Sequence, residues 1–140
     1  MDTDQANQIR QQLPPWHAVW VFGLLLGGIG WIGLVLIFFL TVPTLGPRWL
    51  MFFLLTLAVS GPALPVAHYL HRRFPSKPPA TGAVLVREAL WFGIYADVLL
   101  WLQFGRVLNF ALGAFIAVGV IAVELIIRWR ERTSWTPPAE

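Results

Sequence analysis

Four long apolar stretches, separated by short polar segments, dominate the pattern of this chain. They cover residues 17–40, 49–70, 84–104 and 107–127. Each is close to the ~20 residues that a helix needs to cross the hydrocarbon core of a bilayer. The pattern therefore predicts an all-α integral membrane protein, with four transmembrane helices in an up-down bundle of two hairpins.

The composition supports this class. Hydrophobic residues make up 57% of the chain and charged residues 12%, with a mean hydropathy of +0.67, whereas ordinary soluble domains are roughly 25% charged. The remaining segments, polar tails at 1–15 and 133–140 and a proline-rich loop at 71–83, are too short for a separate soluble domain. Residues 1–140 are therefore expected to form one transmembrane domain. Without cysteine, disulfides and thiolate metal sites are excluded.

The distribution of Lys and Arg predicts the orientation. Setting aside Arg87, which falls inside the third stretch, seven basic residues lie on one side of the predicted membrane and two on the other. The seven are Arg10, Arg72, Arg73, Lys77, Arg128, Arg130 and Arg132, and the two are Arg48 and Arg106. Because cytoplasmic loops accumulate Lys and Arg, both termini and the loop at 71–83 are expected in the cytoplasm, at a bacterial plasma (inner) membrane.

The basic residues also bear on partners. An isoelectric point near 10.2 could indicate nucleic-acid binding, but these residues flank apolar stretches, where they meet the anionic headgroups of the lipid bilayer. We therefore expect anionic lipids at the cytoplasmic face, and no nucleic acid, as partners.

Small residues form helix-packing faces. Gly23, Gly27 and Gly30 recur at i, i+4 and i+7, on one narrow face of the first helix. Gly113 and Ala117 form a similar stripe on the fourth helix. Such stripes let two helix backbones approach closely. Packing within the chain is the expected use, with an oligomer seam as the alternative.

Two prolines interrupt the backbone hydrogen bonding of the second helix. Pro62 and Pro65 each lack an N–H and free a carbonyl one turn back. We expect a kink near mid-membrane, with the hydroxyl of Ser60 or Thr56 satisfying the freed groups.

A polar cluster is expected about one turn inside the cytoplasmic boundary. The third and fourth helices form a tight hairpin around residues 105–106, which places Arg87 and Glu124 at the same depth. Glu124 also continues the stripe of Gly113, so it should face protein. Arg128, one turn further, is a second possible partner for Glu124.

Glu88 and His68 fall at a depth comparable to that of Arg87 and Glu124, and complete the predicted cluster. A charge-neutralised clasp that fixes helix register is the expected role, and an inner gate is the functional alternative.

Asp97 lies near the middle of the third helix, with no basic residue at its depth in the predicted spans. Three accounts are open. The carboxyl group is protonated and hydrogen-bonded to Ser60 or a carbonyl freed by the prolines; or it binds and releases a proton or cation during transport; or it pairs with a group on another subunit.

Evidence for catalysis is weak. His68 and His71, at i, i+3, could offer nitrogens to a metal, with Glu88 or Glu124 completing the shell. Interfacial contact with lipid phosphate explains them as well. No Ser-His-Asp set, phosphate-binding glycine loop or HExxH motif is present. We expect no enzyme activity, no metal and no cofactor.

Two functions fit the sequence. The first is a non-enzymatic accessory or scaffold subunit, which packs with a larger membrane complex through its small-residue faces and Asp97. The alternative is a homo-oligomeric ion- or proton-coupled transporter or channel, with Asp97 as the coupling site.

Overall fold

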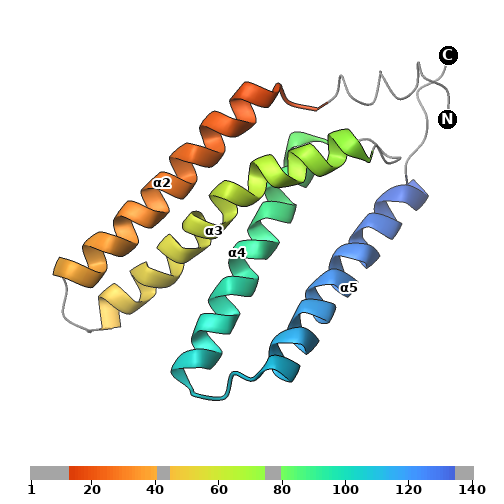
Figure 1. Cartoon of the computed structure of the whole chain (residues 1–140). Coiled ribbons are helices and arrows are strands. Elements are labelled where there is room, and N and C mark those ends of the chain that lie inside the picture. The colour runs from red at the N-terminus through yellow and green to blue at the C-terminus, as the bar shows by residue number, and fades with distance from the viewer. Residues whose placement is uncertain (1–12, 41–44, 75–79, 135–140) are drawn as a thin grey trace, which may run out of the picture.

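The computed structural model describes residues 13–40, 45–74 and 80–134 (Figure 1). These residues form four α-helices: α2 (Trp16–Leu40), α3 (Leu45–Arg73), α4 (Gly82–Phe104) and α5 (Phe110–Ser134). Consecutive helices run in opposite directions, as the up-down prediction requires. Arg10, Lys77, most of the tails and the middle of the proline-rich loop lie outside the described residues.

The helices follow one another in a row (Figure 1). α2 packs extensively on α3 and α3 on α4, whereas α4 and α5 meet at few places. At one end of the row α2 and α4 begin and α3 and α5 end, and we call this the cluster end. The row leaves α2 and α5 at opposite edges.

Three of the four helices are long and apolar enough to cross a membrane: α2, α3 from Gly46, and α5 to Thr133. The described part of the chain is thus that of a membrane protein. α4 has the length, since its 23 residues span about 35 Å. However, every 18-residue stretch of α4 contains Arg87, Glu88 and Asp97. Its crossing therefore depends on what those side chains contact.

Glycine contacts explain the close packing of α2 on α3. Gly23, Gly27 and Gly30 are all buried. A Cβ built on Gly30 would lie 2.3 Å from the backbone nitrogen of Ala58, and one on Gly23 would lie 2.7 Å from the carbonyl oxygen of Gly61. The backbones are close enough to exclude any side chain here. The predicted packing face is confirmed, and its use lies within the chain.

α3 continues through both prolines as one helix. Because Pro65 has no N–H, the carbonyl oxygen of Gly61, one turn back, lacks its usual backbone donor. One of the two hydrogens on the Cα of Gly23 points at this oxygen. A weak Cα–H···O contact from Gly23 thus reaches the Gly61 carbonyl oxygen, which has no N–H donor. The kink at Pro62 and Pro65 stays a prediction.

Several helix boundaries differ from the predicted spans. His71, Arg72 and Arg73 belong to α3, so the connector to α4 is shorter than 71–83. α5 begins at Phe110, not at residue 107, because Asn109 caps it: the N–H of Leu112 donates to Asn109 Oδ1 at 2.7 Å. The tight turn at 105–106 is present, with Arg106 at φ 55°.

Candidate functional site

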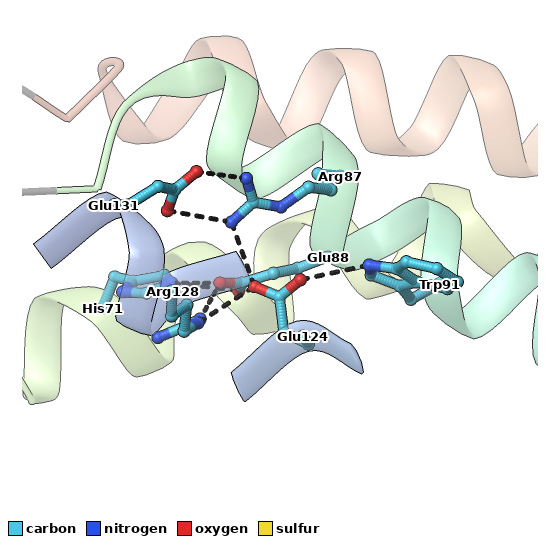
Figure 2. A network of polar contacts seen from close by, with 7 residues as sticks. All are labelled: His71, Arg87, Glu88, Trp91, Glu124, Arg128 and Glu131. Carbon is cyan, nitrogen blue, oxygen red and sulfur yellow. Dashed lines mark hydrogen bonds and ion pairs between the residues drawn. The ribbon is translucent and has the colours of Figure 1, made fainter. Parts of the chain in front are cut away.

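Seven side chains from three helices form a polar network at the cluster end (Figure 2). We call it the polar cluster. α3 contributes His71; α4 contributes Arg87, Glu88 and Trp91; α5 contributes Glu124, Arg128 and Glu131.

Glu124 is the central acceptor of this cluster. Its Oε1 accepts hydrogen bonds from Arg87 Nη2 at 3.1 Å and from Arg128 Nε at 3.0 Å. Its Oε2 accepts one from Trp91 Nε1 at 3.1 Å. The predicted contacts of Glu124 with Arg87 and Arg128 are therefore confirmed. Because Glu124 is only 15% exposed, these bonds replace the water that its carboxylate gives up.

Glu88 links the three helices. Its carboxylate accepts from His71 Nε2, at 3.0 and 2.9 Å, and from Arg128 Nη2. Arg87 reaches past Glu124 to Glu131, two turns further along α5, with Nη2 3.2 Å from Oε2. The cluster thus ties the end of α5 to both α3 and α4.

The formal charges of the cluster nearly cancel. Three carboxylates face two guanidinium groups, and protonation of His71 would complete the balance. Paired charges of this kind can lie inside a membrane boundary at much lower cost than isolated ones. The geometry matches a clasp that fixes the position of α5.

His68 does not join this cluster. It is 1% exposed, its ring lies 5.2 Å from that of Trp16, and its Nε2 bonds the carbonyl oxygen of Pro14 at 2.9 Å. Three residues further along α3, His71 faces α4 and contacts Glu88, so His71 takes the place in the cluster that was predicted for His68. His68 instead ties the start of α2 to α3.

Three cluster members were not predicted: Trp91, Glu131 and His71. Helix spacing could have indicated two of them, because Trp91 follows Arg87 by four residues and Glu131 follows Glu124 by seven. Glu131 was missed because the span was ended at residue 127, whereas α5 continues to Ser134.

Asp97 lies on the face of α4 that packs against α3. It accepts a hydrogen bond from the hydroxyl of Thr56, which also lies 3.1 Å from the carbonyl oxygen of Phe52. The hydrogen-bond partner of Asp97 is thus Thr56, and not the Ser60 hydroxyl or the proline-freed carbonyl named in the first of the three accounts. Asp97 Oδ1 and Ser60 Oγ are both buried without a hydrogen-bond partner among the described residues.

Gly93 allows the close approach of α4 to α3 that pairs Asp97 with Thr56. A Cβ at Gly93 would lie 2.5 Å from Ser60 Oγ and 3.0 Å from the carbonyl oxygen of Thr56. α4 can approach α3 here only because residue 93 has no side chain. Asp97, one turn further, is held against Thr56 by the same close approach.

α5 meets α4 away from the cluster end through Gly113. The hydroxyl of Tyr95 donates to the Gly113 carbonyl oxygen at 3.2 Å, and a Cβ at Gly113 would lie 3.6 Å from Leu99. Gly113 is buried and Ala117 is half-buried. Gly113 thus lies on the face of α5 turned toward α4, as predicted.

Within the described residues, no three His, Asp or Glu side chains are grouped so as to hold a metal ion. His68 and His71 turn to different helices, so the two nitrogens suggested by their spacing do not converge.

The arrangement defines a helical membrane protein with polar groups between its helices and apolar side chains outside. No protein-family model matches this chain, and neither a curated protein nor a solved structure was found to match it. Its function must therefore be argued from the residues themselves.

Proposed function

We propose that this protein is a non-enzymatic membrane subunit that assembles with other membrane-spanning chains as an accessory or scaffold of a larger complex. α5 is the helix that makes the assembly contact. The observation that carries the proposal is the packing of α5: none of its apolar 18-residue window is buried within the chain. Its polar contacts with the other helices are made by Gly113 near its start and by the polar cluster in its second half.

The outer face of α5 is suited to another helix. Ala111, Gly119 and Ala122 are exposed, and on a helix of 3.6 residues per turn they lie on the side away from Gly113 and Glu124. A Cβ at Gly119 would have no atom within 4 Å. Small residues on an outer face allow a second spanning helix to approach closely. The small-residue face of α2, by contrast, is already covered by α3.

The proposed topology has α4 as a fourth transmembrane helix, with both termini and the proline-rich loop in the cytoplasm of a bacterium. The contacts of α4 favour this, because Arg87 and Glu88 pair with other charged side chains and Asp97 accepts from Thr56. A phosphatase fused after residue 140 should be inactive and a fluorescent protein there should fluoresce. An active phosphatase at the C-terminus would contradict the topology.

The assembly proposal is tested by extracting tagged protein at native expression level in gentle detergent, then determining the native mass and every co-migrating chain. We expect a discrete complex with at least one other membrane-spanning chain in fixed ratio. Gly119→Leu should release that chain. Gly28→Leu is the matched control, since a Cβ at Gly28 also meets open space. A wild-type protein that migrates alone, or equal effects of both variants, would contradict the proposal.

Asp97 supports a second candidate, a homo-oligomeric proton- or cation-coupled transporter or channel. Its Oδ1 and Ser60 Oγ are buried and have no partner among the described residues, so both oxygens could serve a proton or cation. Asp97→Asn keeps the shape and removes the titrating group. A carrier should then lose ion-driven flux in proteoliposomes, whereas an assembly subunit should form its complex unchanged.

A further inference from the structure

A cavity of about 370 Å³, open on its outer side, lies along the C-terminal part of α5. Its lining residues are Leu125, Ile126, Arg128, Trp129 and Arg132. Four of them recur at i, i+3, i+4 and i+7, so they share one face of the helix. Leu125 and Ile126 lie toward the middle of α5, and the other three lining residues lie toward its end.

The cavity offers unused hydrogen-bond donors. Arg128 uses Nε for Glu124 and Nη2 for Glu88, which leaves the two N–H groups of Nη1 for another acceptor. Arg132 is exposed and donates to no acceptor in the described residues. Two guanidinium groups one turn apart therefore line the same cavity.

The two charged side chains that line the cavity are both arginines. The nearby carboxylates of Glu88 and Glu124 already bind Arg128, and Glu131 binds Arg87. No acidic residue lines the cavity. The positive charge of Arg132 is therefore not paired with a carboxylate among the described residues, and it is available to an anion.

We propose that this cavity binds an anionic phospholipid, with the headgroup phosphate between Arg128 and Arg132. The acyl chains lie along Leu125 and Ile126, and Trp129 lies at the level where tryptophan meets lipid headgroups. Arginine suits this role because its planar fork of donors matches phosphate oxygens. The inference rests on the proposed crossing of α5, which brings its C-terminal end to the membrane surface, and not on its assembly with another chain.

A structural role for Arg132 makes a different prediction. A cation in the last turn stabilises a helix by interacting with the negative end of its dipole. In that case its replacement would change helix stability and leave lipid binding unchanged.

The experiment is native mass spectrometry of the purified full chain in neutral detergent, titrated with phosphatidylglycerol or phosphatidylcholine. We expect one phosphatidylglycerol to bind more tightly than phosphatidylcholine, and Arg132→Gln to weaken its binding about tenfold or more, as for a lost charge-assisted hydrogen bond. Arg73→Gln is the control, because it removes an exposed charge at the same end of the row without touching the cavity. Arg73→Gln should weaken phosphatidylglycerol binding at most about fivefold, which is the effect of one surface charge.

Equal effects of Arg132→Gln and Arg73→Gln would overturn the site in favour of general surface charge. Displacement of the lipid by millimolar glycerol 3-phosphate would overturn the lipid assignment, because soluble phosphate should not compete with an anchored one. If Arg132→Gln loses its helical circular dichroism, Arg132→Lys replaces it and should bind phosphatidylglycerol severalfold more weakly than wild type. If Arg132→Lys binds phosphatidylglycerol as tightly as the wild type does, the contact between the planar guanidinium group and the phosphate is overturned. Partner release by Gly119→Leu remains a separate readout, so the two proposals can fail independently.

Discussion

The tightest contact between α2 and α3 gives a prediction whose magnitude follows from the structure. A Cβ at Gly30 would lie 2.3 Å from Ala58 N, 2.6 Å from Ala58 Cα and 2.8 Å from Leu54 O, where ordinary contact begins at 3.4 Å. All three are backbone atoms and cannot rotate away. Gly30→Ala therefore requires the two helices to separate by roughly 1 Å, which forfeits about a quarter to a half of the dispersion energy of each opened contact.

Gly28→Ala is the matched control, in the same helix and facing open space. Both variants gain the ~1 kcal/mol helix propensity of alanine over glycine, so their difference isolates the clash. We expect Gly30→Ala to be less stable than Gly28→Ala by about 1–3 kcal/mol, the range for overpacking.

The assay is reversible unfolding in mixed micelles with increasing dodecyl sulfate, followed by circular dichroism. Gly33→Ala serves as an intermediate case, since its Cβ would meet only the movable end of the Leu54 side chain. Equal unfolding free energies for Gly30→Ala and Gly28→Ala would refute the packing of α2 on α3 through this face.

Three further predictions concern single contacts. Glu124→Gln should lower the unfolding free energy by about 1–3 kcal/mol in the same assay, because three donors lose a charged acceptor; the more exposed Glu131→Gln should cost less, and the reverse order would count against Glu124 as the centre of the clasp. Thr56→Val keeps the shape of the side chain but leaves Asp97 without its hydrogen-bond donor. It should lower the unfolding free energy by about 1–3 kcal/mol in the wild-type background and by much less in an Asp97→Leu background. Arg106→Gly should raise the unfolding free energy by about 1 kcal/mol, because residue 106 has φ 55°, a conformation that strains any residue with a side chain more than glycine. The thermal midpoint should rise accordingly, and an unchanged or lower midpoint would contradict this.

Contacts that depend on spacing along one helix or across one tight turn could be predicted from the sequence. The level placement of Arg87 and Glu124 follows from counting outward from the turn at 105–106. The face formed by Gly23, Gly27 and Gly30 follows from helix periodicity. Both depend on local geometry, which the residue numbers contain.

Contacts that depend on the rotation of one helix against another could not be predicted. His68 and His71 both fall near the same boundary, and only the packing of α3 shows that His71 faces α4. The partner of Asp97 likewise depends on which side of α3 lies opposite Gly93. The sparse packing of α5 was missed because hydropathy describes each helix alone.

Assembly through α5 is tested most directly by cross-linking in native membranes. The chain has no cysteine, so Gly119→Cys and Gly28→Cys each give a single reactive site on a different helix. With a short bifunctional thiol reagent, the account predicts a discrete adduct with another membrane-spanning chain from position 119 and none from position 28. An adduct with a second copy of this chain alone, equal adducts from both positions, or no adduct at position 119 would contradict it.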